Sequence, residues 1–417
     1  MINFIEMFND KISISLRDNF ISHADALAIA EALKVNTTLT DIYLEKNSIG
    51  DDGASALADA LKVNTTLTKL ELSKNYIGDI GACALADALK VNINKKKLKE
   101  IFLCLRKAFN NNILYNAMTS YYKNNKNEIT SLTTIYLGHN EIGDAGASAL
   151  ADALKVNTTL KEISLAENNI GIVGASALAD ALKVNTYLTE INLYWNSIGD
   201  AGACALADAL KVNTYLTWID LRQNQIGDVG ATAIADALKV NTTLRYINLE
   251  WNSIGDAGAS ALADALKVNT TLTKLVLRLN FRIGNAGSCA LADSLKVNTT
   301  LEYISLEYCT IDDAGASALA DALKVNTTLT MIDLRSNDIG DAGARALAEA
   351  LKVNTTLMKL ELSKNLIRDA GARALADALK VNTTLKEINL NINENGDTSA
   401  SALAEALKVN TTLTLII

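Results

Sequence analysis

The sequence is built from a unit of 28 residues that recurs from one end of the chain to the other. One copy, residues 227–254, reads GDVGATAIADALKVNTTLRYINLEWNSI, and its neighbours differ from it only at scattered positions. Fourteen segments carry the frame L-x-x-I/L-x-L-x-x-N-x-I or a close variant, and a truncated fifteenth follows them. Self-similarity at such a period is typical of a repeat array in which each unit packs on its neighbours. We therefore expect a single solenoid over residues 1–417, with about 14 helix–strand units.

The copy at residues 255–280 shows what one unit is expected to form. The run AGASALADALKV is rich in strong helix formers, and Asp256 is placed to cap the amino end of that helix. Asn269 follows the last helical turn, where Asn tolerates the left-handed conformation that ends a helix. The frame L-x-x-L-x-L then predicts a short strand with one buried face. Because every strand returns to the next through a helix, we expect an α/β right-handed solenoid horseshoe with a concave parallel β-sheet and convex α-helices.

The frame L-x-x-L-x-L-x-x-N resembles the leucine-rich repeat signature. The 28-residue length with a full helix is similar to the ribonuclease-inhibitor-like type, which also forms the repeat arrays of NOD-like receptors. The resemblance covers nearly the whole chain and implies that the Asn of each repeat bonds neighbouring backbone inside the turn. Cys309 is a substitute that the family accepts at this position, whereas Arg106 is not. We call these residues the ladder asparagines: Asn19, Asn47, Asn75, Asn140, Asn168, Asn196, Asn224, Asn252, Asn280, Asn337, Asn365 and Asn393.

Three stretches depart from the period. Residues 92–131 form an irregular longer repeat with a lysine-rich start and no GDAGA, and we expect its helix to pack on its neighbours. This repeat is either a protruding partner site or a degenerate copy with a solvated lysine run. A one-residue insertion at residues 280–283 bulges one turn. The C-terminal end, residues 391–417, is degenerate and closes on an apolar edge strand through which the chain could self-associate.

Composition and motifs exclude several functions. The net charge of -8 and the lack of a basic stripe argue against nucleic acid as a partner. No window is long and apolar enough to span a membrane, and the N-terminus does not resemble a secretory signal, so we expect a cytoplasmic protein. Export as an effector without an ordinary signal stays open. With only two His and no catalytic motif, we expect no enzyme, no cofactor and no metal.

The candidate interaction site is argued from the strand positions that vary. Residues two, four and six before a ladder asparagine point to the concave face, and the residue just before it lies on the ascending loop. Only 5% of the chain is aromatic, yet all three tryptophans fall at such positions in three consecutive repeats. Aromatic residues interleaved with Arg and carboxylates are typical of a protein-binding hot spot. The candidate protein-binding residues are Asn192, Tyr194, Trp195, Trp218, Asp220, Arg222, Tyr246, Asn248, Glu250, Trp251, Tyr303 and Tyr308.

Within this set, Trp218 and Tyr246 are expected to be neighbours near the amino ends of their strands, whereas Tyr194, Trp195 and Trp251 lie near the carboxyl ends. The alternative interpretation is that the aromatic side chains only pack on one another to cover the sheet, with no partner.

The function favoured by these features is a non-enzymatic protein–protein interaction scaffold. It would bind a protein partner, whose identity the sequence does not name, through the concave face and the ascending loops. The resemblance also implies an alternative, a GTPase-activating protein of the Ran GTPase-activating type, although no catalytic Asn or Arg can be matched. A third possibility is a secreted effector or surface ligand.

Overall fold

The computed structural model of the chain describes residues 4–90, 131–394 and 396–416. The chain divides into two compact units, and the boundary between them lies at Asn196 and Ser197. We call these unit 1 and unit 2. The expectation of a single solenoid over residues 1–417 stays a prediction. The irregular repeat at residues 92–131, with its expected helix, lies outside the described residues except for Ser131.

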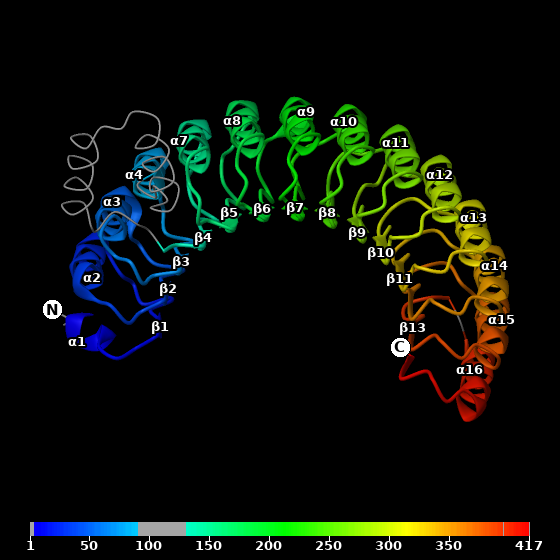
Figure 1. Cartoon of the computed structure of the whole chain (residues 1–417). Helices are drawn as coiled ribbons and strands as arrows, with labels where there is room; N and C mark the ends of the chain where they lie inside the picture. Colours follow the sequence, from blue (N-terminus) through cyan, green and yellow to red (C-terminus); the bar gives the residue numbers. More distant parts are fainter. Residues whose placement is uncertain (1–3, 91–130, 395, 417) are drawn as a thin grey trace, which may run out of the picture. The chain divides into compact units, whose positions relative to one another are not determined.

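In unit 1, strands of three residues alternate with helices, most of them of 11–13 residues (Figure 1). The elements in chain order are α1 (Phe4–Phe8), β1 (Ser13–Ser15), α2 (His23–Val35), β2 (Asp41–Tyr43), α3 (Gly50–Leu61), β3 (Lys69–Glu71), α4 (Asp79–Lys90), β4 (Thr134–Tyr136), α7 (Asp144–Leu154), β5 (Glu162–Ser164), α8 (Ile172–Leu182) and β6 (Glu190–Asn192).

Unit 2 repeats the same alternation. Its elements are α9 (Gly199–Leu210), β7 (Trp218–Asp220), α10 (Asp228–Leu238), β8 (Tyr246–Asn248), α11 (Asp256–Leu266), β9 (Lys274–Val276), α12 (Asn285–Leu295), β10 (Tyr303–Ser305), α13 (Asp313–Leu323), β11 (Met331–Asp333), α14 (Asp341–Leu351), β12 (Lys359–Glu361), α15 (Asp369–Leu379), β13 (Glu387–Asn389), α16 (Asp397–Val409) and β14 (Leu415–Ile416).

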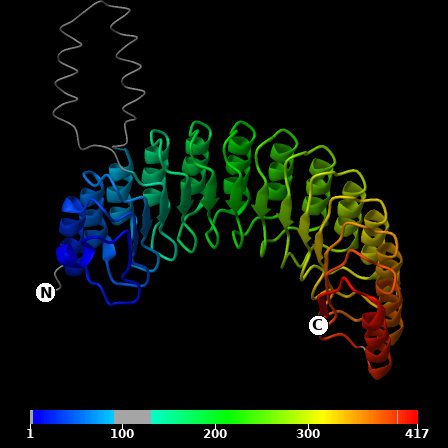
Figure 2. The ribbon, with the colours of Figure 1, turned by 60° about the horizontal axis from the view of Figure 1, so that its bottom comes forward.

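Each unit has a parallel sheet whose strands pair in chain order, usually with a register offset of one repeat. In unit 2, for example, Trp218 lies opposite Tyr246, which lies opposite Lys274 on the next strand. Within each unit the helices cover one face of the sheet and leave the other open (Figures 1 and 2). The repeated Leu, Ile and Ala side chains between helices and strands are almost completely buried, because together they form the apolar face of each element. The predicted α/β solenoid class is confirmed.

The two strands of unit 1 that flank residues 91–130 in the sequence pair directly with each other. β3 pairs with β4, and Lys69 lies opposite Thr134. The ladder also passes directly, because the backbone N–H of Asn75 donates to Oδ1 of Asn140 over 3.0 Å. The sheet and the asparagine ladder are therefore continuous between the repeats that contain β3 and β4.

The expected cap at Asp256 is wrong about which helix the side chain serves. Asp256 is the first residue of α11, and Gly255 precedes it without a side-chain cap. Its Oδ1 instead accepts the backbone N–H groups of Gly284 and Gly287, each over 2.8 Å, at the start of the following helix α12. A carboxylate at a helix amino end satisfies orphan N–H groups and complements the helix dipole. Asp256 therefore joins two repeats.

The same forward capping recurs within both units. Asp51, Asp79 and Asp144 in unit 1, and Asp200, Asp228, Asp313, Asp341 and Asp369 in unit 2, bond the helix start of the following repeat. The arrangement requires a close approach. A Cβ at Gly258 would lie 2.8 Å from Oδ1 of Asp228 and 2.9 Å from Cβ of Ala231, distances that real Cβ atoms do not show. The second Gly of the GDAGA motif is explained by this contact.

The expectation of a left-handed conformation at Asn269 is also wrong. Asn269 is not among the residues with positive φ, and its side chain forms a second ladder. Its Nδ2 donates to the carbonyl groups of Leu238 and Asn241 in the preceding repeat, over 2.8 and 3.3 Å, while its Oδ1 accepts the N–H groups of Thr271 and Leu272. Asn269 is 5% exposed, so these bonds satisfy buried backbone.

The ladder asparagines behave as the resemblance implied. Nδ2 of Asn252 donates to the carbonyl groups of Leu221 and Leu249, each over 3.0 Å, and its Oδ1 accepts the N–H groups of Asn224 and Ile226. The ladder continues into the degenerate C-terminal end, where Oδ1 of Asn393 accepts the N–H group of Ile367. Self-association through β14 stays a prediction.

Cys309 cannot supply the carboxamide oxygen that Ile283 would need. The inserted residue removes that need, because the longer loop lets the N–H of Ile283 donate to the carbonyl of Asn280 over 3.0 Å. The thiol of Cys309 retains only a long contact of 3.6 Å to the carbonyl of Leu277. The insertion therefore compensates for the carboxamide oxygen that Cys309 lacks.

Candidate protein-interaction surface

The open sheet face of unit 2 carries the first pair of predicted aromatic residues. Trp218 on β7 and Tyr246 on β8 lie opposite each other in register, and their rings stack with centroids 5.1 Å apart and planes 5° apart. The expectation that they are neighbours is confirmed. Both rings are partly buried, and Lys274 separates Tyr246 from Tyr303 along the same row of positions. Tyr303 is therefore not part of this stack.

Asn248 holds the hydroxyl group of Tyr246. Its Nδ2 donates to the hydroxyl of Tyr246 over 3.1 Å, and its Oδ1 accepts the backbone N–H of Glu250 over 2.9 Å. Burial raises the pKa of Tyr246, and the nearby carboxylate of Asp220 adds to the effect. Asn248 is only 4% exposed, so its place in the predicted site is that of a positioning residue.

Asp220 and Arg222 form a bidentate ion pair on the adjacent strand. Nε of Arg222 lies 3.0 and 2.8 Å from the two carboxylate oxygens of Asp220, and an Nη atom lies 2.8 Å from Oδ2. Asp220 is 1% exposed, and its burial raises its pKa although the hydrogen bonds from Arg222 lower it. The pair fixes the guanidinium in a planar fork on the sheet face.

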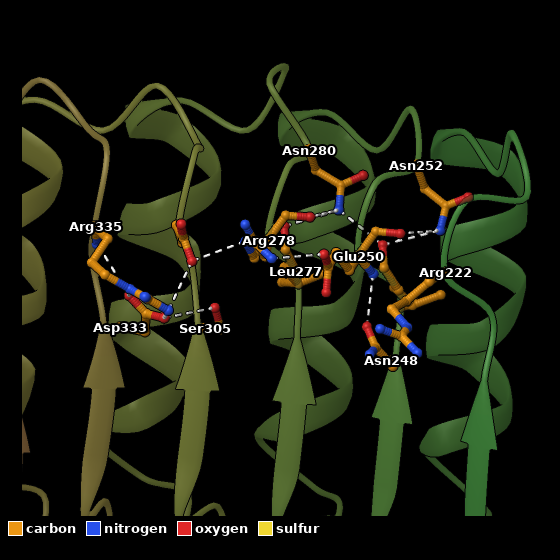
Figure 3. Close-up of polar contacts among 12 residues, drawn as sticks. Arg222, Asn248, Glu250, Asn252, Leu277, Arg278, Asn280, Ser305, Asp333 and Arg335 are labelled. Carbon is orange, nitrogen blue, oxygen red and sulfur yellow. Dashed lines mark hydrogen bonds and ion pairs between the residues drawn. The ribbon is translucent and has the colours of Figure 1, made fainter. Parts of the chain in front are cut away.

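A longer chain of ion pairs crosses the carboxyl ends of the strands β8–β11 (Figure 3). Arg278 lies between two carboxylates, with Nη1 3.1 Å from Oε1 of Glu250 and Nε 2.9 Å from Oε2 of Glu307. The contact with Glu307 is close enough for an ion pair but lies out of line for a hydrogen bond. Arg335 contacts Glu307 and Asp333, with Nη2–O distances of 2.9 and 2.7 Å. With two guanidinium groups and three carboxylates, this chain of ion pairs carries one negative charge in excess.

The ascending loops present their side chains differently. The residue just before each ladder position has a positive φ, and in unit 2 this residue is Gln223, Trp251, Leu279, Tyr308, Ser336, Lys364 or Ile392. Side chains there project away from the core, so the scaffold does not restrict their type. Trp251 has φ 51° and is 52% exposed. A bulky residue in this conformation is uncommon and is favoured where function retains it.

Four large apolar side chains lie on adjacent ascending loops of unit 2, and we call them the rim patch: Trp251, Leu279, Phe281 and Tyr308. The loops are hydrogen-bonded side by side, because the N–H of Trp251 donates to Arg278 and that of Leu279 donates to Glu307. The rings of Phe281 and Tyr308 meet edge to face with centroids 6.3 Å apart. Phe281 is 54% exposed, so much of its ring remains open to solvent.

Sequence reasoning missed Leu279 and Phe281. Leu279 occupies the same position as Trp251 in the next repeat, so the positional rule that found the tryptophan could have found it. Phe281 is one of the two residues that stand between Asn280 and Ile283, where other repeats have a single residue. The insertion itself was the signal, since a bulge between two ordered repeats displaces one side chain outward.

Unit 1 contains the remaining predicted residues. Oδ1 of Asn192 on β6 accepts the N–H of Tyr194 over 3.0 Å, and the rings of Tyr194 and Trp195 meet at a tilt with centroids 6.0 Å apart. Trp195 has φ 51° and is 50% exposed, as Trp251 is in unit 2. The sequence-predicted set is thus a sheet-face group and two loop groups.

Two searches of the described residues concern other functions. None of the helices in residues 4–90, 131–394 and 396–416 has the length and apolarity needed to span a bilayer. Within the same ranges, no three His, Cys, Asp or Glu side chains gather closely enough to hold a metal ion.

Ten segments of the chain match the family model described as "Leucine Rich repeat". They cover residues 35–58, 63–86, 128–151, 156–179, 184–207, 212–235, 240–263, 297–320, 325–348 and 353–376, more than half of the chain. No match was found among curated proteins.

A solved structure with a similar fold covers most of this chain. An internalin from Listeria monocytogenes is 20% identical, with a TM-score of 0.51, over 90% of this chain and 87% of the internalin chain. Two weaker likenesses are the complex of Rad7 and Elc1 in yeast and the actin-binding site 2 of leiomodin-1. The first is 15% identical over 87% of this chain and 79% of that chain, with a TM-score of 0.49. The second is 30% identical over 32% of this chain and 77% of that chain, with a TM-score of 0.30.

Proposed function

The chain belongs to the leucine-rich repeat family, and we propose that it is a non-enzymatic scaffold that binds a protein partner through its ascending loops and the adjoining open sheet face. Family membership supports an interaction scaffold in general terms. The observation that carries the more specific proposal is the rim patch of unit 2. Three of its side chains occupy the position before the ladder residue, where other repeats of unit 2 have Gln, Ser, Lys or Ile, so the scaffold does not fix the residue type there.

The surroundings of the rim patch support a hot spot of moderate size. The exposed rings of Trp251 and Phe281 belong to loops that adjoin Arg278, whose guanidinium group pairs with Glu250 and Glu307. A partner that covers the rings would not have to strip water from unpaired charges, which is a costly step in binding. Large aromatic side chains ringed by compensated polar groups are the usual composition of the centre of an interface.

The test compares matched variants of the intact chain as bait. We expect Trp251→Ser and Phe281→Ser each to weaken capture of a bound partner at least tenfold, because each removes an anchor ring. Val268→Ser is the matched control, since Val268 is 58% exposed but lies on the turn after α11, outside the rim patch. A partner retained equally by all three variants would contradict the proposal.

Trp218→Ala separates the two interpretations of the sheet face. If the stack with Tyr246 contributes to the partner site, the variant weakens binding while the melting temperature stays unchanged. If the rings only cover the sheet, the variant lowers stability and leaves partner binding as it was. Both quantities are measured on the same preparation by titration and by thermal unfolding.

The alternative of GTPase activation has no observation of its own in support. A catalytic arginine must reach the nucleotide, whereas Arg222, Arg278 and Arg335 on the sheet face of unit 2 each bond carboxylates of the same face. A single-turnover GTP hydrolysis assay, with and without the chain, tests this alternative. We also propose that the repeats are of the ribonuclease-inhibitor-like type and that the protein lies in the cytoplasm.

A further inference from the structure

Unit 1 has a hollow of about 500 Å³ above the ascending loops that follow β1 to β4. Its walls include Phe20, Tyr76, Lys74 and Glu141, and none of these residues belongs to the predicted site. Phe20 is 88% exposed and Tyr76 is 66% exposed, and both have positive φ, 55° and 58°. In most other repeats the position that follows a ladder asparagine holds a polar residue. Two walls of the hollow are therefore aromatic rings at a position where the repeat does not require an aromatic residue.

Tyr76 has a positive φ that most repeats lack at the residue after the ladder asparagine, and it shares this conformation with Phe20 and with Gln225 of unit 2. At Tyr76 and at Gln225 the capping Asp of an earlier repeat is replaced, by His23 and by Ile172 respectively. His23 stands 28 residues before Asp51, at the position where other repeats have the forward-capping Asp. The helix after it, α3, accordingly has no side-chain cap and begins at Gly50, with φ 61°. The N–H of Gly50 donates to the carbonyl of Asn75 over 2.9 Å. The backbone at Tyr76 is therefore displaced into the left-handed conformation that presents its ring.

Some of the charged side chains on the walls form ion pairs and others do not. Nζ of Lys46 lies 2.7 Å from Oδ2 of Asp18, and Nδ1 of His139 lies 2.6 Å from Oε2 of Glu167. Among the described residues, neither the ammonium group of Lys74 nor the carboxylate of Glu141 has such a partner. The hollow thus offers two apolar rings, one available cation and one available anion.

We propose that this hollow binds an extended segment of a partner protein in which one apolar side chain lies between a carboxylate and a cation. The apolar side chain would fill the space between Phe20 and Tyr76, and the two charges would pair with Lys74 and Glu141. The balanced charge of the walls does not suit a nucleic acid or an anionic membrane, both of which require an excess of basic groups. This site is separate from the rim patch of unit 2, so the proposal does not depend on the proposed function.

The probe is a pair of blocked pentapeptides, Glu-Ser-Leu-Ser-Lys and its reverse order, because alternate side chains of an extended segment share a face. We expect the intact chain to bind one of the two peptides saturably with a Kd below about 1 mM. Binding is measured by NMR titration of the labelled methyl groups of the peptide's leucine. Failure of both orders to saturate would overturn the proposal.

Variants test each wall. We expect Tyr76→Ala to reduce affinity at least tenfold, whereas Tyr187→Ala, which alters an exposed tyrosine outside the hollow, leaves it unchanged. Lys74→Glu should weaken binding of the probe at least tenfold and strengthen binding of a probe whose Glu is replaced by Lys. Unchanged affinity in Tyr76→Ala or Lys74→Glu, or equal affinity for a probe with Ser at both charged positions, would overturn the assignment. Trp251→Ser is expected to bind the probe normally, so failure here is distinguishable from failure of the rim patch.

Discussion

At the scale of single residues, Gly50 shows how one substitution in a repeat is transmitted to the next. Its φ of 61° follows from the loss of the forward cap at His23, and no atom outside its chain neighbours lies within 4 Å of a Cβ built on it. An alanine side chain at Gly50 would therefore cause no steric clash. The left-handed backbone alone disfavours any other residue.

We expect Gly50→Ala to lower the free energy of unfolding by about 1 kcal/mol, because alanine adopts this conformation at a cost. Gly284→Ala is the control. Gly284 has φ -110°, and Asp312 and Arg368 occupy the equivalent position with φ -102° and -104°. The control should therefore stay within about 0.5 kcal/mol of the parent chain in urea unfolding. Equal losses in the two variants would show that the φ of Gly50 is not the cause.

Residue types were easier to predict than their partners. The sequence indicated that Asp256 caps a helix and that Asn269 ends one. Both residues do bond the backbone at a helix end, but each reaches into an adjacent repeat. Periodicity reports which face of an element a side chain occupies. It does not report which of two similar neighbouring repeats that face contacts. Asp256 contacts the following repeat, whereas Asn269 contacts the preceding one.

At the scale of elements, the insertion in the loop after β9 and Cys309 form a compensated pair. Deleting Arg282 should deprive the N–H of Ile283 of its bond to Asn280, and with Cys309 in place no carboxamide oxygen replaces it. We expect a loss of about 1–3 kcal/mol, the cost of a buried unpaired amide.

The same deletion in a Cys309→Asn chain should cost at least 1 kcal/mol less, because the new Oδ1 can accept that N–H as Asn280 does for Ile254. Urea unfolding of the four chains gives this coupling as a double-mutant cycle. Additive losses would mean that the insertion and the cysteine are independent.

The period alone does not predict which strands are neighbours in the sheet. β3 and β4 pair directly, although residues 91–130 lie between their repeats in the sequence. The irregular repeat has no GDAGA and has Arg106 at the ladder position. It therefore lacks the Asp and the Asn that join the described repeats to their neighbours.

At the scale of whole units, each interface between ordinary repeats carries the same polar bonds, so a repeat should be transferable. We expect a second copy of residues 227–254, inserted directly after Ile254, to leave the melting temperature no lower than that of the parent chain. Asp228 in each copy caps the helix that follows it. A second copy of residues 283–310 is the matched control of equal length. It should lower the melting temperature, since its first Cys309 would be followed by an Ile whose N–H has neither an insertion nor an asparagine to accept it.

The fold class followed almost entirely from the repeat, because a strictly periodic apolar pattern leaves few ways to bury its core. The candidate site followed only in part. Trp218 and Tyr246 could be paired from register alone, whereas the burial of Asp220 and the prominence of Phe281 depend on side-chain geometry that the frame does not encode. The hollow beside Tyr76 had two sequence signals, the replacement of one Asp by His23 and the aromatic residues Phe20 and Tyr76 directly after ladder asparagines.

That replacement also bears on how unit 1 moves. Each ordinary boundary between helices is fastened by a carboxylate that bonds two amides of the next helix, but the boundary between α2 and α3 lacks this fastening. Local opening starts where the fewest bonds must break, so we expect unit 1 to breathe first at that boundary. The loop of Tyr76 is hydrogen-bonded to the start of α3. A segment bound in the hollow would therefore reduce local opening at the boundary between α2 and α3, which lacks a forward cap.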